Sequence, residues 1–145
     1  MAGTYIAVKF DEATLDRIES IQKQLNLYNI VPRDKLHSTI CYSRVDVPYF
    51  PDETPKVIGK SKGLLIFNND KRALVLTIDS PYLVSKHELT KELGATYDYP
   101  DYIPHVTQSY DIGYISYDES QVPEIDIGIT TEYVEALDLD WTDSL

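Results

Sequence analysis

The triplet His37-Ser38-Thr39, within "LHSTICYS" (residues 36–43), returns as His105-Val106-Thr107 at the start of "HVTQSY" (residues 105–110). Alternate residues of a strand point the same way, so in each predicted strand the histidine shares a face with its threonine. The chain has three histidines and 11 threonines. Two of three histidines would stand two residues before a threonine by chance about one time in sixty. The repetition therefore points to a shared role for the two triplets.

The first triplet follows a strand and a helix. Residues 4–10 alternate as a half-buried strand does, which places Tyr5 and Ile6 on opposite faces. Residues 11–27 have acids in the first turn and apolar side chains at helical spacing, which predicts an amphipathic helix. A turn-prone segment then leads into the strand predicted over residues 36–43.

The second triplet follows a similar series of elements. After a proline-rich loop over residues 46–55, two β-rich runs around an Asn-Asn-Asp turn predict a hairpin over residues 63–79. Ser80 resembles the N-cap of a helix over residues 81–93. A loop rich in tyrosine and proline then leads to the strand over residues 105–110.

The spacing of the two units indicates a repeat of architecture. Tyr5 and His37 are 32 residues apart (37 − 5), and Val75 and His105, which hold similar places in the second unit, are 30 apart (105 − 75). Identity between the halves is slight, so only the order of elements repeats. Strands in two groups, with helices packed on the outside, predict an α+β fold with two related lobes.

The chain is long enough for one hydrophobic core, which predicts a single domain over residues 1–145. The first lobe comprises roughly residues 1–56, together with a last strand predicted over residues 126–141. The second lobe comprises roughly residues 57–128.

The composition argues against a membrane protein or a disordered chain. Hydrophobic residues make up 43% of the sequence without a long apolar run, and the N-terminus passes directly into the first strand without the segments of a signal peptide. A cytoplasmic protein is expected. The single cysteine, Cys41, can form neither an internal disulfide nor a structural zinc site alone.

The net charge of −11 is distributed unevenly. All 13 Lys and Arg residues lie at or before Lys91 with 11 of the 24 acids, whereas residues 92–145 hold the other 13 acids (24 − 11). Long nucleic acids are usually bound by a broad basic face, which this chain lacks. A small ligand with one or two phosphates is compatible with this distribution.

Two His-x-Thr strands brought together would present two imidazoles and two hydroxyls across one groove. Histidine titrates near pH ~6.5, which suits one ring to accept a proton and the other to donate one. The hydroxyls can donate to the non-bridging oxygens of a phosphate. This constellation fits cleavage of a phosphodiester without a metal or other cofactor. His87 differs, because it falls within a predicted helix and no threonine follows two residues later, so it is expected at the surface or in helix packing.

The paired triplets, each at the end of a strand-helix-strand unit, resemble the motifs of the two-histidine (2H) phosphoesterase superfamily. The resemblance covers nearly the whole chain. It implies a bilobal 2H-phosphoesterase-like fold with two pseudo-symmetric antiparallel sheets and helices packed outside. Within the superfamily, the size, the acidic C-terminal half and the terminal "EALDLDW" (residues 135–141) look most like the phage anti-CBASS nucleases, which degrade the cyclic nucleotide signals of bacterial immunity.

By this resemblance, His37 and His105 would be the general acid and base, in an order that the sequence leaves open, and Thr39 and Thr107 would donate to the phosphate. The implied reaction is attack by the ribose 2′-hydroxyl on a 3′–5′ bond of a cyclic di- or oligonucleotide such as 3′,3′-cGAMP. It leads to linear 3′-phosphorylated products. The implied location is the bacterial host's cytoplasm.

Three further residues match the subfamily by location. Tyr5, Glu135 and Trp141 would hold a base, since aromatic stacking on a base contributes about 1–3 kcal/mol and a carboxylate can accept from a base amine. Each has an alternative role in packing. The tyrosines around the second triplet, Tyr97 to Tyr117, could cover the site or pack within loops, and Arg33, Lys35 and Arg44 are the cations nearest the first triplet.

Other functions fit parts of the pattern. An RNA-end 2′,3′-cyclic phosphodiesterase would keep both histidines, although the acidic half disfavours a chain of phosphates. A protein that sequesters cyclic nucleotides without cleaving them would not need two titrating groups. A metal-binding role for His37 and His105 predicts sensitivity to EDTA. The sequence does not reveal the oligomeric state.

Overall fold

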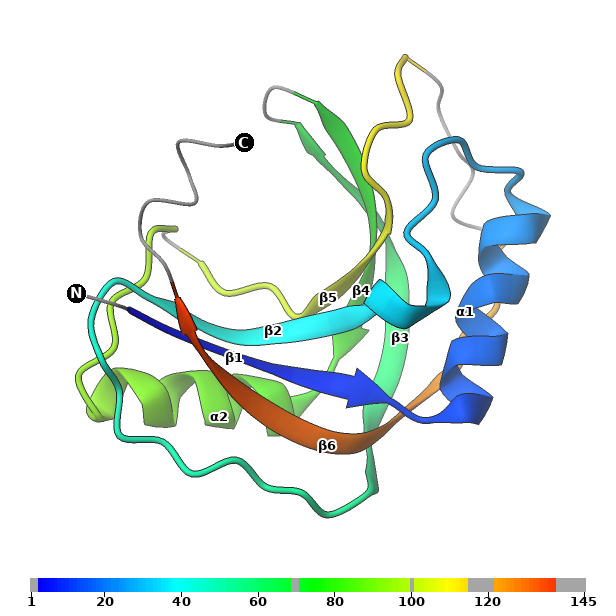
Figure 1. Cartoon of the computed structure of the whole chain (residues 1–145). Helices are drawn as coiled ribbons and strands as arrows, with labels where there is room; N and C mark the ends of the chain where they lie inside the picture. Colours follow the sequence, from blue (N-terminus) through cyan, green and yellow to red (C-terminus); the bar gives the residue numbers. More distant parts are fainter. Residues whose placement is uncertain (1–2, 69–70, 100, 115–121, 138–145) are drawn as a thin grey trace.

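The computed structural model describes residues 3–68, 71–99, 101–114 and 122–137. Within these residues, six strands and two α-helices follow one another (Figure 1). In order they are β1 (Gly3–Phe10), α1 (Glu12–Gln24), the short 3-10 helix η1 (Arg33–Lys35), β2 (His37–Ser43), β3 (Lys56–Asn68), β4 (Arg72–Asp79), α2 (Pro81–Glu92), β5 (His105–Ser109) and β6 (Asp126–Leu137).

Both helices begin at the predicted residues because side chains cap them. The Asp11 carboxylate accepts from the Thr14 backbone N–H at 2.8 Å at the start of α1. The Ser80 hydroxyl accepts from the Leu83 N–H at 3.1 Å at the start of α2. Gly94 has a φ of 103°, a left-handed conformation that glycine adopts readily just after a helix. The predicted helices are therefore confirmed.

Strand β3 is longer than predicted. It starts at Lys56, directly after the proline-rich loop, whereas the sequence indicated a hairpin from residue 63. The added segment "KVIGKSK" buries only Ile58 and Ser61, and Val57 is 68% exposed. Strands are predicted from the alternation of apolar and polar residues, and a segment with so few buried apolar side chains shows this alternation only weakly.

The strands form one continuous antiparallel sheet in the order β2-β1-β6-β3-β4-β5. The expectation of two separate pseudo-symmetric sheets therefore needs correction, although the α+β class is confirmed. The 12-residue strand β6 explains the difference, because its first part pairs with β3 and its longer second part pairs with β1. The two lobe ranges remain a prediction.

The sheet bends strongly, so that the β3–β4 hairpin rises from the plane of β1, β2 and β6, and both helices lie on its outer side (Figure 1). Buried apolar side chains of both helices and all six strands form one core cluster. Helix α1 begins tightly against β6, where the Asp11 N–H donates to the Gly128 carbonyl at 3.0 Å. A Cβ at residue 128 would lie 2.0 Å from an Asp11 carboxylate oxygen, so a larger residue there would displace the carboxylate that caps α1. Neither α1 nor α2 is long and apolar enough to cross a membrane.

The bending brings the two edge strands of the sheet together. Ahead of β2, the Val31 N–H donates to the Gln108 carbonyl of β5 at 3.0 Å, and Ile30 forms an isolated antiparallel bridge with Ser109. The buried amide of Gln22, on α1, donates to the carbonyls of both Val31 and Gln108 at 3.1 Å. These contacts hold β2 and β5 close to each other, although they are the two edge strands of the sheet.

Candidate active site

The two His-x-Thr triplets lie on the facing edge strands β2 and β5. His37 and Thr39 occupy one face of β2, and His105 and Thr107 occupy one face of β5, with the residues between them buried in the opposite direction. All four side chains are half-buried. Strands β2 and β5 contact each other, and a charge on His37 lowers the pKa of His105.

Both histidines are anchored by the same contact. The Nδ1 atom of His37 lies 2.7 Å from the Lys35 carbonyl, and the Nδ1 atom of His105 lies 2.7 Å from the Ile103 carbonyl, in each case two residues earlier. A carbonyl oxygen only accepts, so Nδ1 carries the proton in both neutral rings. The available nitrogen is therefore Nε2, with a lone pair in a neutral ring and a proton in a charged one. Each ring can serve as base or acid through the same atom.

Burial lowers the pKa of His105 below the ordinary value for histidine, the Ile103 carbonyl opposes this shift, and the neighbouring His37 adds to it. Phe67, at the end of β3, packs against the His105 ring edge to face, with centroids 4.8 Å apart. His105 is therefore largely neutral at pH 7. The apolar wall that Phe67 provides was not predicted from the sequence.

Tyr5 lies next to the first triplet, as its place on β1 predicts. Its hydroxyl is 2.9 Å from Thr39 Oγ1, and its ring packs edge to face with His37 at 6.2 Å. In the β1–β6 register Tyr5 is opposite Glu135, and the Tyr133 ring lies 6.3 Å away on the same side. The structure thus brings together Tyr5, Glu135, His37 and Thr39. Trp141 lies outside the described residues.

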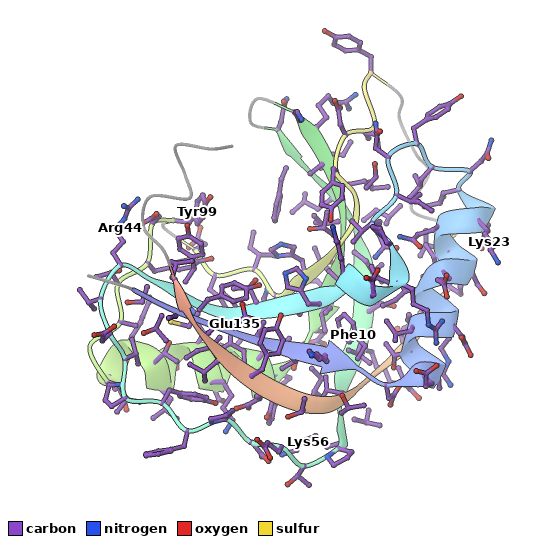
Figure 2. The ribbon with its side chains drawn as sticks, viewed as in Figure 1. Phe10, Lys23, Arg44, Lys56, Tyr99 and Glu135 are labelled. Atoms are coloured by element: carbon purple, nitrogen blue, oxygen red, sulfur yellow. The ribbon has the colours of Figure 1, made fainter. Side chains whose placement is uncertain are left out.

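A pocket of about 500 Å³ lies between the triplets and the loop that precedes β5. Thr39 and His105 form its reactive edge, and Figure 2 shows Tyr99 near the end of β2. Most of the remaining lining is aromatic or aliphatic, with two polar side chains. These residues are Tyr42, Ile66, Phe67, Asn68, Tyr97, Tyr99, Asp101, Tyr102 and Ile103.

Two of the cations near the first triplet, Arg33 and Arg44, already form ion pairs with acidic residues. Arg33 forms ion pairs with Glu12, Asp16 and Glu19 along α1, and Arg44 pairs with Asp98 at 2.9 Å. Figure 2 shows Arg44 at the far end of β2 and Lys23 on the outer side of α1. Both arginines therefore serve local ion pairs rather than a ligand.

Lys9 is a cation at the site that the sequence did not single out. It is exposed, it is the cross-strand partner of His37 on β1, and its Nζ lies 5.2 Å from the centroid of the Tyr133 ring. The alternation of residues 4–10 places Lys9 on the same face of the strand as Tyr5, and this pattern in the sequence could have indicated that Lys9 lies at the site. Among the described residues, no group of three or more His, Cys, Asp and Glu side chains is arranged to hold a metal ion.

His87 packs inside the molecule, so of the two positions expected for it, at the surface or in helix packing, the structure shows the second. It is 3% exposed, and its ring stacks on Tyr102 with centroids 4.0 Å apart and an interplanar angle of 5°. Burial lowers the pKa of His87, and the nearby Lys91 also lowers it, while the Ile40 carbonyl and Glu88 raise it.

Comparison with known sequences identifies the family. The model of the family described as anti-CBASS protein Acb1 matches residues 2–144. The chain belongs to this family. It is 53% identical over 140 residues to the anti-CBASS protein Acb1 of Acinetobacter phage Ac42, covering 96% of this chain and 93% of that protein. It is 46% identical over 145 residues to the Acb1 protein of Enterobacteria phage T4, covering 99% and 93%.

Solved structures agree with the fold. Escherichia coli LigT complexed with 3′-AMP superposes with a TM-score of 0.63 at 12% identity, over 92% of this chain and 86% of LigT. A crystal structure described as a phosphoesterase gives 0.61 at 12% identity, over 92% and 86%. The predicted 2H-phosphoesterase-like fold is confirmed. Membership of the Acb1 family, with this fold, also confirms the predicted enzyme class, a phosphodiesterase with an anti-CBASS role that degrades cyclic nucleotides.

Proposed function

We propose that this member of the Acb1 family cleaves 3′–5′ bonds of cyclic di- and oligonucleotide signals, such as 3′,3′-cGAMP, with His37 and His105 as its acid and base. One observation carries the proposal. Two half-buried His-x-Thr triplets come from opposite edges of the sheet, and each histidine is anchored through Nδ1 so that Nε2 is available. Binding alone would not need two such rings.

The environment of His105 favours one order of proton transfer. His105 is the more suitable base for the first step, because burial lowers its pKa and leaves Nε2 with a free lone pair at pH 7. It takes the proton of the ribose 2′-hydroxyl as that oxygen bonds to phosphorus. His37 Nε2–H then protonates the departing 5′-oxygen, and the product carries a 2′,3′-cyclic phosphate.

The second step opens the cyclic phosphate with the roles reversed. His37, now neutral, takes a proton from water as the water oxygen attacks phosphorus, and His105 returns its proton to the 2′-oxygen. The product is a linear nucleotide with a 3′-phosphate. The Thr39 and Thr107 hydroxyls donate to the non-bridging oxygens, on which negative charge increases in both transition states. Lys9 lies close enough to His37 to add a positive charge near that phosphate.

The bases of the substrate have two places to bind. Tyr5 and Glu135, with Trp141 beyond them in the chain, would hold one base as the family resemblance implies. The aromatic pocket beside His105 is mostly apolar, and its volume of about 500 Å³ is large enough for a second base. We propose that the protein acts in the cytoplasm of a bacterial host, because similar proteins belong to Acinetobacter phage Ac42 and Enterobacteria phage T4.

The test is product analysis by chromatography and mass spectrometry. The protein is incubated in excess EDTA with 3′,3′-cGAMP and, separately, with an RNA ending in a 2′,3′-cyclic phosphate. We expect ring opening of the cyclic dinucleotide, and a loss of rate of at least about 100-fold in His37→Ala and His105→Ala. The melting temperature of each variant shows that it remains folded.

Other outcomes would contradict the proposal in distinct ways. Processing of the RNA end alone would support an RNA-end phosphodiesterase. Tight binding of 3′,3′-cGAMP without cleavage would support a sequestering protein. Abolition of activity by EDTA would support a metal site at His37 and His105.

A further inference from the structure

A β-bulge interrupts strand β2 directly after the first triplet. In the β1–β2 register Ala7 is opposite Thr39 and Ile6 is opposite Cys41, so Ile40 has no partner on β1. The extra residue shifts the alternation of side chains, and Tyr42 therefore lies on the same side as Thr39, where both line the pocket. Bulges re-aim side chains in this way beside active sites.

Two side chains from outside the sheet donate to successive carbonyls at the bulge. The Tyr102 hydroxyl donates to the Thr39 carbonyl at 2.7 Å, and His87 Nδ1 donates to the Ile40 carbonyl at 2.7 Å. One donor comes from the loop before β5 and the other from α2, so the backbone of Thr39 is held from two elements.

The two donors also hold each other. The rings of His87 and Tyr102 stack in parallel, with centroids 4.0 Å apart, and Tyr97 packs edge to face against His87 at 4.6 Å. His87 Nε2 is buried, and no described residue forms a hydrogen bond with it. A buried nitrogen without a partner carries a desolvation cost, and an apolar ring could stack equally well. The Nδ1 hydrogen bond to the bulge is the feature that only a histidine ring supplies here.

We propose that Tyr102 and His87 are positioning residues for the reaction, which fix the bulge and thereby aim the Thr39 hydroxyl at the phosphate. The inference rests on the proposed function, because Thr39 matters only if a phosphate reacts beside it. Neither side chain needs to contact the reacting atoms. Tyr102 acts through the Thr39 carbonyl, and His87 acts through the Ile40 carbonyl and as the platform on which Tyr102 stacks.

A double-mutant cycle tests whether Tyr102 acts through Thr39. Tyr102→Phe keeps the stacked ring and removes only the hydrogen bond. We expect kcat for 3′,3′-cGAMP to fall about five- to tenfold with KM within about twofold, the effect of losing one neutral hydrogen bond that orients a reacting group. Once Thr39→Val has removed the hydroxyl, adding Tyr102→Phe should lower kcat no further.

His87 is tested by two variants that separate its contacts. His87→Leu removes both the stacking platform and the donor, and should reproduce the loss of kcat seen in Tyr102→Phe. His87→Asn places an amide donor near the Nδ1 position and should recover part of that loss. Tyr49→Phe serves as the control, because its hydroxyl donates to Glu132 at 2.5 Å and is not part of the proposed site, so it should alter stability but not kcat.

Three results would overturn the inference. The first is an unchanged kcat in Tyr102→Phe with a lowered melting temperature, which would show a structural role alone. The second is independent losses in the double variant, which would show that Tyr102 contacts the substrate directly. The third is a wild-type protein that cleaves no cyclic dinucleotide, and only this result would also contradict the proposed function.

Discussion

At the scale of single residues, the site depends on how a few polar atoms are oriented. The two histidines are equivalent in their Nδ1 contacts but differ in environment, since burial and the nearby His37 hold the pKa of His105 low. The sequence reveals the residue types and their pairing. It does not reveal which ring is the more desolvated, because Phe67 and the loop before β5 reach His105 only through the tertiary fold.

Tyr5→Phe tests the contact between Tyr5 and the first triplet. The Tyr5 hydroxyl lies 2.9 Å from Thr39 Oγ1, so its loss should leave that hydroxyl less well oriented. We expect kcat for 3′,3′-cGAMP to fall about three- to tenfold without a change of fold. Tyr28→Phe is the control, because Tyr28 is 63% exposed and lies in the loop after α1. Equal kcat values for the two variants would contradict a role for Tyr5.

The buried histidines predict how stability depends on pH. Burial lowers the pKa of His87 and of His105 in the folded protein, so the unfolded chain binds protons first as the pH falls below about 6.5. The free energy of unfolding should therefore decrease with falling pH below about 6.5, before most carboxylates titrate. His87→Phe should make this decrease shallower, as measured by urea denaturation at a series of pH values. A slope identical to that of the wild-type protein would contradict the assignment.

At the scale of elements, the two faces of strand β6 have different roles. One face contributes to the candidate site, and the other contributes to stability. Tyr133 and Glu135 belong to the site side, whereas Glu132 is 1% exposed on the other face. The Glu132 carboxylate accepts from the hydroxyls of Tyr49 and Tyr82 and from the Asp52 N–H at 2.8 Å. This network fastens the proline-rich loop and α2 to the sheet.

Glu132→Ala should therefore affect stability rather than catalysis. It leaves one buried and two part-buried donors without this acceptor, and we expect a loss of about 2–4 kcal/mol in the free energy of unfolding. At a temperature well below its melting point, kcat should match the wild-type value. Glu135→Ala is the matched variant three residues along the strand, and it should raise KM with little loss of stability. A loss of kcat in folded Glu132→Ala would contradict the separation of the two faces.

Most elements could be predicted from the sequence, whereas their joining into one continuous sheet could not. The caps at Asp11 and Ser80 and the alternation in β1 are local signals, and they correctly placed both helices and the first strand. The bulge at Ile40 has no local signal, because it appears only in the register of β2 against β1. The joining of both halves into one sheet depends on β6 pairing with two partners, which a one-dimensional pattern does not show.

At the scale of the whole molecule, function depends on a six-stranded sheet whose two outer edges face each other. Gln22 is central to this closure, since its amide reaches the carbonyls of Val31 and Gln108 from α1. Its role as a link between the two edges depends on residues 86 positions apart in sequence, and no local pattern reveals it.

Gln22→Leu tests whether this closure sets the spacing of the triplets. Leucine preserves the packing volume approximately and removes both hydrogen bonds. We expect the free energy of unfolding to fall by about 1–3 kcal/mol and kcat/KM for 3′,3′-cGAMP to fall at least about threefold, because the two histidines are no longer held at a fixed separation. Lower stability with an unchanged kcat/KM would show that other contacts set the spacing.

The most direct test of the central claim, that one histidine acts as base and the other as acid at a single phosphate, uses a cyclic dinucleotide with sulfur in place of the bridging 5′-oxygen. A thiolate leaves without protonation, because thiols have pKa values near 8.5, so the acid becomes dispensable while the base does not. We predict that His37→Ala cleaves this substrate at close to the wild-type rate and that His105→Ala remains inactive. Rescue of both variants, or of neither, would contradict the division of roles between the two triplets.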